Sequence, residues 1–232
     1  MKAIAVSEQG AGLAGMSLTE RPEPSAAIND VLVEVHASGF VPTELEWPST
    51  WVDRQGRDRT PSVPGHELSG VVAALGYGTT GLSVGQRVYG LTDWYRDGTL
   101  AEYTAVEARN LAPLPQDIDF EVAASLPISG LTAWQGLFDH GRLRAGQSVL
   151  AHGAAGAVGA MVTQLAREAG APSSAPGAPA TARRCWTSAH TSSSTSSTTR
   201  SRTLAASTSC STSSAATCRG GRWRSSVQEG PS

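Results

Sequence analysis

The sequence has no cysteine before Cys185, and only three in all: Cys185, Cys210 and Cys218. Their spacing provides neither a paired-cysteine zinc motif nor the disulfide framework that holds small secreted domains together. A chain of 232 residues without such cross-links depends on a buried apolar core for its stability. Hydrophobic residues make up 40% of the chain, which is enough for one large domain or two small ones.

Long apolar runs and a strong net charge are also missing. No apolar segment approaches the ~20 residues that span a bilayer, and the opening MKAIAVSEQG has neither a signal-peptide nor a transit-peptide pattern. The net charge of -2 provides no global attraction to nucleic acid or to an anionic membrane. We therefore expect a soluble, cytoplasmic protein whose partner is a small-molecule substrate, with no nucleic-acid or membrane partner.

Short strands separated by glycine and proline dominate the first half of the chain, a pattern typical of a small β-barrel. The apolar or alternating runs are Lys2–Val6, Asp30–Gly39, Leu68–Gly76 and Gln86–Leu91. Over Asp119–Leu143 the period becomes helical, although Pro127 interrupts it. The apolar positions of that helical pattern are Val122, Leu126, Leu131, Trp134 and Leu137. A short strand is then predicted over Gln147–His152.

A glycine-rich turn follows that strand, with Gly153, Gly156 and Gly159 in the spacing G-x-x-G-x-x-G. Glycines let the backbone turn sharply and approach a pyrophosphate, whose charge a helix N-terminus then stabilises. Its position between a strand and an amphipathic helix favours a dinucleotide site over a turn that only packs a helix against a sheet. The apolar face of that helix consists of Val158, Met161, Val162, Leu165 and Ala169.

Four segments, in this order, resemble the medium-chain dehydrogenase/reductase superfamily, and in particular its zinc-independent NADPH:quinone reductase-like branch. They are Val63–Val72 (VPGHELSGVV), Gly81–Gly90 (GLSVGQRVYG), Ala124–Leu137 (ASLPISGLTAWQGL) and Ala145–Gly159 (AGQSVLAHGAAGAVG). An ordered series of motifs is more specific than any one of them. The resemblance implies an alcohol dehydrogenase GroES-like barrel followed by a Rossmann domain.

Zinc-dependent members of this family bind a catalytic metal through two cysteines and a histidine. The resemblance places Val41 and Ile128 at the two cysteine positions, and His66 at the histidine position. Glu44 and Glu67 remain as candidate oxygen ligands, but a catalytic zinc needs three good protein ligands. The four-cysteine structural zinc lobe is missing as well. We therefore expect no metal site and interpret His66 as a hydrogen-bonded residue of the barrel.

The resemblance implies NADPH as the cofactor, with NADH as an alternative, and hydride transfer to a quinone or an α,β-unsaturated carbonyl. In such enzymes the cofactor carries the chemistry and the protein supplies binding and orientation. By resemblance, Thr132 would contact the nicotinamide. The diphosphate would be held at Gly153, Gly156, Ala157, Val158 and Gly159. For the full-length family the resemblance also implies a homodimer.

The sequence assigns no catalytic acid or base, so the catalytic residues stay unknown. Trp94 and Tyr95 are candidates to line a substrate pocket, or else ordinary aromatic residues of the barrel surface. Thr43 and Glu44 are candidates to face the nicotinamide, or else part of a solvated loop.

From Pro172 to Ser232 aliphatic residues nearly vanish, and 27 of these 61 residues are serine or threonine. This composition cannot bury a core, so one interpretation is a disordered tail. The other is a shifted reading frame, because Leu204–Thr217, back-translated and read two bases later, encodes GGVDLVLDVIGGD, which is typical of a Rossmann strand. Thr191–Thr203 conceals EFVDLVDDALED in the same way. We favour the shifted frame.

The sequence thus predicts an α/β fold: an N-terminal GroES-like β-barrel, the start of a Rossmann domain, and a disordered or out-of-frame tail. The expected divisions are 1–118 for the barrel, 119–171 for a truncated nucleotide-binding domain, and 172–232 for the tail. In such a chain Val149 and Leu150 would have no neighbouring strand. The alternatives to a quinone or enone reductase are an inactive fragment or non-catalytic ligand-binding barrel, and an alcohol dehydrogenase-like enzyme.

Overall fold

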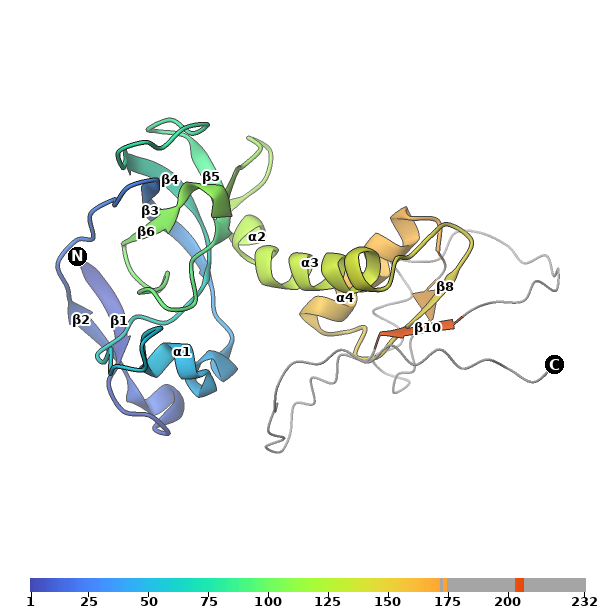
Figure 1. Cartoon of the computed structure of the whole chain (residues 1–232), viewed down its shortest axis with the longest axis horizontal. Coiled ribbons are helices and arrows are strands. Elements are labelled where there is room, and N and C mark those ends of the chain that lie inside the picture. The colour runs from blue at the N-terminus through green and yellow to red at the C-terminus, as the bar shows by residue number, and fades with distance from the viewer. Residues whose placement is uncertain (172, 175–202, 207–232) are drawn as a thin grey trace. The chain divides into compact units, whose positions relative to one another are not determined.

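The computed structural model describes residues 1–171, 173–174 and 203–206. The chain divides into two compact units, Met1–Ile128 and Ser129–Ser232. The first unit is built mainly from antiparallel strands, and the second combines helices with a small parallel sheet (Figure 1). The fold is therefore α/β with a β-rich N-terminal part, as predicted.

A five-stranded antiparallel sheet forms the centre of the first unit, in the strand order β6-β3-β4-β5-β7. Its strands are β3 (Asp30–Gly39), β4 (Glu67–Leu75), β5 (Arg87–Leu91), β6 (Tyr103–Glu107) and β7 (Leu111–Pro113). Successive side chains of a strand point to opposite faces, so alternate residues of these strands enter one core. That core consists of Val31, Val33, Leu68, Val72, Val88 and Val106.

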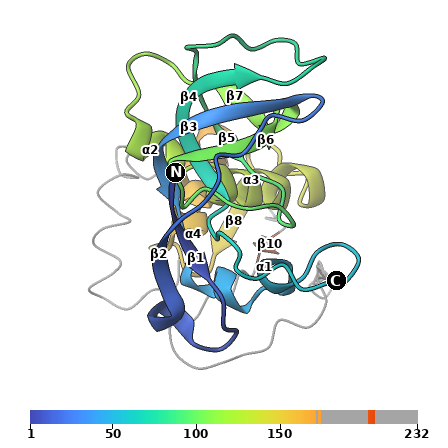
Figure 2. The same cartoon turned by 90° about the vertical axis from the view of Figure 1, so that its left-hand side faces the viewer.

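A two-stranded antiparallel sheet, β1 (Lys2–Val6) with β2 (Met16–Glu20), completes the strands of this unit (Figure 2). The four predicted strands are all present, and β1 and β3 have the predicted bounds. The pattern missed β2, β6 and β7, which are five residues or shorter. Short helical turns connect the strands: η1 (Gly12–Gly15), η2 (Pro42–Glu46), α1 (Pro48–Trp51) and η3 (Ala108–Asn110).

The predicted helical region is divided into three pieces: α2 (Phe120–Ala124), α3 (Pro127–Trp134) and the π-helix η4 (Gln135–His140). The helical prediction is confirmed, but the apolar positions named for it do not share a buried face: Val122, Leu131 and Trp134 are 49–51% exposed, and of these positions only Leu137 joins a core. Pro127 starts a new helix, and the wider π turn shifts the phase again. Positions counted at one continuous helical spacing therefore do not share a face.

The second unit contains a strand, a turn and a helix in the predicted order, β8 (Ser148–Ala151) followed by α4 (Ala157–Glu168). The predicted apolar face of α4 is confirmed, because Val162 is buried and the other four residues named for it pack against the same core. The buried members of that core are Ala133, Leu137, Leu143, Val149, Ala151, Ala154, Val162, Ala166 and Ala171.

Two further strands flank β8, so the expectation that it lacks a neighbour is wrong. β9 (Ser173–Ser174) and β10 (Thr203–Ala206) both run parallel to β8, in the order β10-β8-β9. Val149 lies opposite Ser173 on one side and Leu204 on the other. The ladder is made by backbone groups, so a serine-rich or alanine-rich segment can pair with an apolar strand. The other predictions for the tail concern residues outside the described ones.

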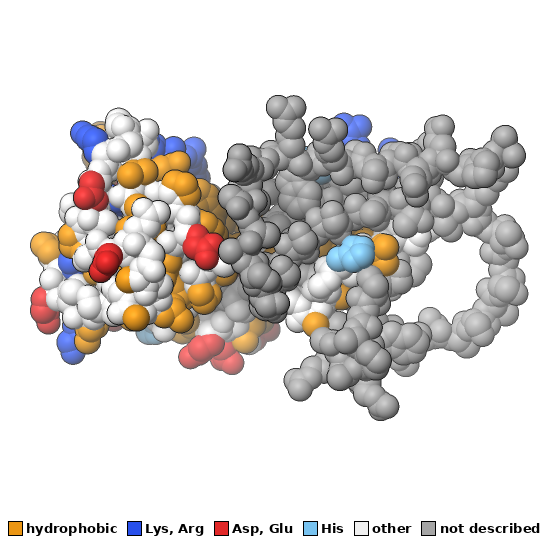
Figure 3. All heavy atoms as spheres, turned by 90° about the horizontal axis from the view of Figure 1, so that it is seen from below, with side chains coloured by type: hydrophobic (Ala, Val, Ile, Leu, Met, Phe, Trp, Pro, Cys, Tyr) orange, Lys and Arg blue, Asp and Glu red, His pale blue; other side chains and the backbone are white. Residues whose placement is uncertain are grey.

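Two surface properties complete the description. Among the described residues, no helix combines the length and the apolar character needed to cross a membrane. On the face shown in Figure 3, acidic and basic side chains are scattered among apolar and uncharged ones. Where described residues are visible in this view, they form no patch of a single charge.

Candidate functional site

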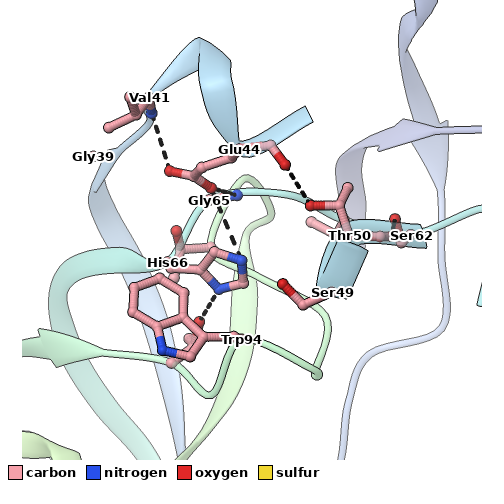
Figure 4. Close-up of polar contacts among 12 residues, drawn as sticks. Gly39, Val41, Glu44, Ser49, Thr50, Ser62, Gly65, His66 and Trp94 are labelled. Atoms are coloured by element: carbon pink, nitrogen blue, oxygen red, sulfur yellow. Dashed lines mark hydrogen bonds and ion pairs between the residues drawn. The ribbon is translucent and has the colours of Figure 1, made fainter. Parts of the chain in front are cut away.

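His66 is buried in the first unit, immediately before β4, with 1% of its surface exposed. Its Nδ1 lies 2.9 Å from the hydroxyl oxygen of Thr92, and the Thr92 N–H donates to the backbone oxygen of His66 at 2.9 Å. Its Nε2 lies 3.9 Å from Oε2 of Glu44 (Figure 4). His66 is thus a hydrogen-bonded residue of the barrel interior, as predicted.

Glu44 is fully buried, and its carboxylate joins two loops. One oxygen accepts the Val41 N–H at 3.0 Å, and the other accepts the Gly65 N–H at 3.0 Å. The Gly65 backbone has a φ of +89°, and a Cβ there would lie 2.7 Å from the hydroxyl of Thr99, so this position requires glycine. The solvated-loop interpretation is therefore wrong for Glu44, whereas its neighbour Thr43 is exposed.

Burial controls the charge of both groups. Desolvation raises the pKa of Glu44, although the hydrogen bonds from Val41 and Gly65 act in the opposite direction. Desolvation, assisted by the positive charge of Arg59 and opposed by Asp93, lowers the pKa of His66 to about 4. The nearby Glu44 does not reverse this, because the same low-polarity environment opposes charge on both partners. At neutral pH the His66 imidazole is uncharged.

Two tryptophans pack against this imidazole. The Trp94 indole meets it edge to face with ring centroids 4.8 Å apart, and the Trp47 indole lies nearly parallel to it at 6.0 Å. The two indoles also contact each other edge to face at 5.2 Å. Trp94 remains 38% exposed, whereas Trp47 is half-buried. The result is a cluster of three rings with one partly accessible end.

Glu67, the first residue of β4, is the second buried carboxylate beside His66. Its Oε1 accepts the Ile128 N–H at 2.7 Å, near the N-terminal end of α3, where a negative charge is stabilising. Burial nevertheless raises its pKa, against this hydrogen bond. Gly39 allows the close packing, because a Cβ there would lie 2.4 Å from Glu67 Oε2.

These residues do not fit a catalytic zinc. Val41 and Ile128 stand at the positions where the resemblance expects cysteines, and neither has a metal-binding side chain. Their N–H groups are instead the donors to Glu44 and Glu67, the two carboxylates that could have served as oxygen ligands. Within the part of the chain that the structure describes, no group of three histidine, cysteine or acidic residues could hold a metal ion.

The three glycines of the β8–α4 turn have different structural roles. Gly153 has a φ of +69°, which favours glycine. Gly159 is buried, and a Cβ there would lie 2.2 Å from the backbone oxygen of Gly153. Gly156 is the N-cap residue of α4, with an extended backbone, and a Cβ there would meet only the Gly153 oxygen, at 3.3 Å. Glycine is needed for the turn at Gly153 and for packing at Gly159. At Gly156 the lack of a side chain leaves the N-terminal N–H groups of α4 uncovered on that side.

The N-terminus of α4 is suited to bind an anion. The N–H groups of Ala157, Val158 and Gly159 have no acceptor within the helix, and Gly156 has no side chain that could cap them. The first turn contains no acidic residue, and Gly156 and Ala157 are exposed. The helix dipole adds a partial positive charge at this end. A diphosphate is the kind of ligand that this arrangement favours.

Two further residues, Thr132 and Tyr95, were also candidates from the sequence. Thr132 is half-buried on α3, and its contact with a nicotinamide stays a prediction. Tyr95 is 37% exposed and carries the guanidinium of Arg54 over its ring at 4.9 Å. Arg54 is in turn ion-paired with Asp93.

Several known proteins are similar to this chain in sequence or in fold. Residues 27–116 match the family model of the alcohol dehydrogenase GroES-like domain. The quinone oxidoreductase of Rattus norvegicus is 34% identical over 170 residues, which cover 73% of this chain and 50% of that protein. The chain therefore contains an alcohol dehydrogenase GroES-like domain and is similar to quinone oxidoreductases. It spans about half the length of the curated quinone oxidoreductases that it matches.

Two other known proteins are also similar. The 2-methylene-furan-3-one reductase of Solanum lycopersicum is 36% identical over 155 residues, covering 62% of this chain and 38% of that protein. A mycobacterial protein solved in complex with NADPH matches with a TM-score of 0.70 and 31% identity, over 81% of this chain and 56% of that one.

Sequence reasoning missed the partners of His66. Thr92 and Trp94 lie 26 and 28 residues beyond it in the chain, and nothing in their local sequence marks them as its neighbours. Trp47 lies in the segment of Val41, Thr43 and Glu44, the residues there for which the sequence predicted a role. The one signal in the sequence was the presence of Trp47 and Trp94 in a chain that has only six tryptophans, since such large rings often pack together.

Proposed function

We propose that this chain binds a nicotinamide dinucleotide, NADPH in preference to NADH, and supports metal-free reduction of a quinone or an α,β-unsaturated carbonyl. When bound, the nicotinamide supplies a hydride. A quinone that accepts this hydride and one proton from solvent becomes a hydroquinone, and NADPH becomes NADP⁺. Similarity to quinone oxidoreductases and to an enone reductase supports this choice of acceptors.

The observation that carries the proposal is the open N-terminus of α4. Its first three N–H groups, which have no acceptor within the helix, would hold the diphosphate, and Gly156 would leave the space through which it approaches. Because the barrel offers no set of metal ligands, its residues would act by orienting the substrate and by excluding water. The NADPH complex of a similar protein supports the choice of cofactor.

The sharpest test is a charge placed at Gly156. Its extended backbone accepts any residue, and aspartate is a favoured N-cap that should preserve or stabilise α4. The same carboxylate would repel a diphosphate. In Gly156→Asp we expect NADPH affinity, measured by calorimetry, to fall by at least about tenfold, which corresponds to about 1.4 kcal/mol.

Gly156→Ser is the matched control, because serine also caps the helix but carries no charge. Its NADPH affinity should stay within about threefold of the unaltered chain, equivalent to less than 1 kcal/mol. Equal affinities in the two variants would remove the turn from the cofactor site. No NADPH binding by the unaltered chain would favour the alternative of a non-catalytic ligand-binding barrel.

A further inference from the structure

Trp47, His66 and Trp94 pack their three rings together, with Trp94 meeting the other two edge to face, and Trp94 is partly accessible. Figure 4 shows the imidazole of His66 lying between Glu44 and the Trp94 indole. His66 is 1% exposed and Trp94 is 38% exposed, so the cluster runs from the barrel interior to the surface. A partly exposed indole that is held in place by edge-to-face contacts with two further rings offers an apolar aromatic surface for another ring.

The loop that carries Trp94 is held firmly in place. The Thr92 N–H donates to the His66 backbone oxygen at 2.9 Å, and the Gly98 N–H donates to the Val63 oxygen at 2.8 Å. The guanidinium of Arg59 bridges the Ser49 and Trp94 backbone oxygens, at 2.5 and 3.3 Å. A surface that is already ordered loses little conformational entropy when a ligand binds to it.

The electronic character of the cluster favours one class of ligand. The indole face carries negative partial charge, and its preferred neighbours are ring edges or electron-poor rings in offset stacking. At neutral pH His66 adds no positive charge that would draw an anionic ligand to the cluster. A quinone ring is planar, uncharged and electron-poor, whereas a small aliphatic enone has little flat surface to place on an indole.

We propose that the Trp94 indole, supported by His66 and Trp47, is the stacking surface for the substrate ring and selects fused-ring quinones over small monocyclic enones. This inference deepens the proposed function and rests on it.

Binding and turnover should be measured separately on the full chain. The probes are phenanthrenequinone, which is planar and has three fused rings, and cyclohexenone. In Trp94→Leu, the dissociation constant for phenanthrenequinone from equilibrium dialysis without nucleotide should rise about tenfold, corresponding to about 1.4 kcal/mol. Trp94→Phe keeps an aromatic ring and should restore most of the affinity.

Two controls make the result specific. Tyr77→Ala removes a ring that is 87% exposed at another turn of the barrel, and should leave the binding of both probes unchanged. With NADPH, the specificity ratio of kcat/KM for phenanthrenequinone over cyclohexenone should fall about tenfold in Trp94→Leu, mostly through KM. The second control is the fold itself: circular dichroism spectra and melting temperatures of each variant should match those of the unaltered chain.

The outcomes separate this inference from the proposed function. Equal affinity of Trp94→Leu and the unaltered chain for phenanthrenequinone would overturn the stacking surface, even if NADPH oxidation continued. An equal loss of affinity for phenanthrenequinone and cyclohexenone would also overturn the stacking surface, because an effect common to both probes shows no selection between them. Trp94-dependent phenanthrenequinone binding without NADPH oxidation would leave the stacking surface intact and reject the reductase function.

Discussion

Lowering the pH should destabilise the barrel through His66. Burial holds this imidazole uncharged, with its pKa lowered from 6.5 to about 4. Because the folded state disfavours the proton, His66 contributes stability that is fully present above pH 6.5 and is lost as the pH falls toward 4. The difference between these pKa values corresponds to about 3 kcal/mol of unfolding free energy.

Other groups near His66 titrate in the opposite sense. The pKa values of Glu44 and Glu67 are raised by burial, so their contribution to stability grows as the pH falls and they become protonated. The positive charge of Arg59 lowers the pKa of His66, and the negative charge of Asp93 opposes that effect. The pH profile of the unaltered chain alone would therefore mix contributions of different sign.

The comparison with His66→Gln isolates the imidazole. Glutamine is uncharged at every pH, so the stability of this variant should lack the His66 component while it retains those of the carboxylates. Urea unfolding followed by tryptophan fluorescence should be measured between about pH 7.5 and 4.5. The difference in unfolding free energy between the two proteins should shift by about 2–3 kcal/mol across this range.

The sign of that shift is fixed by the structure: the unaltered protein loses stability relative to the variant as the medium becomes acidic. Melting temperatures at the same pH values provide an independent check. A constant difference between the two proteins would refute the assignment of His66 as a buried, uncharged imidazole. A difference that grew in favour of the unaltered chain at low pH would indicate a charged His66–Glu44 pair instead.

Three further results are expected. Protein purified without a metal-affinity tag should contain far less than one zinc per chain by elemental analysis, and activity that a chelator abolished and zinc restored would contradict this. Asp30→Asn should cost about 2–3 kcal/mol in urea unfolding, because it breaks the pair between the buried Asp30 carboxylate and Arg96; a loss below about 0.5 kcal/mol would show that the pair is weak. Gly159→Ala should weaken amide-exchange protection in β8 and α4, since its Cβ would meet the Gly153 oxygen at 2.2 Å, whereas Gly156→Ala should leave that protection nearly unchanged.

Several parts of the fold could be predicted because their causes are local. The alternation in Asp30–Gly39 comes from the two faces of one strand, and it predicted the bounds of β3 without knowledge of its neighbours. The apolar face of α4 was equally readable, because one uninterrupted helix fixes the phase of its side chains. Where Pro127 and the π turn break the helix, the same reasoning failed for Val122 and Trp134.

The candidate site was only partly readable, because its contacts join distant segments. Glu44 and Gly65 are 21 residues apart, and Glu67 and Ile128 are 61 apart. A carboxylate in a turn-rich segment looks solvated until the strands that bury it are in place. Similarly, pairing of β8 with β9 and β10 depends on backbone groups, which side-chain composition does not reveal.

The sequence by itself determined the glycine turn and the lack of thiol ligands, since both depend on which atoms a residue has or lacks. Only the tertiary structure decided what replaces the metal ligands: the N–H groups of Val41 and Ile128 bind the two buried carboxylates, and His66 packs between these groups and two indoles, nearly parallel to Trp47 and edge to face with Trp94. The physical reason is that backbone freedom and ligand chemistry belong to single residues. Desolvation and stacking arise only when segments far apart in the sequence exclude water together.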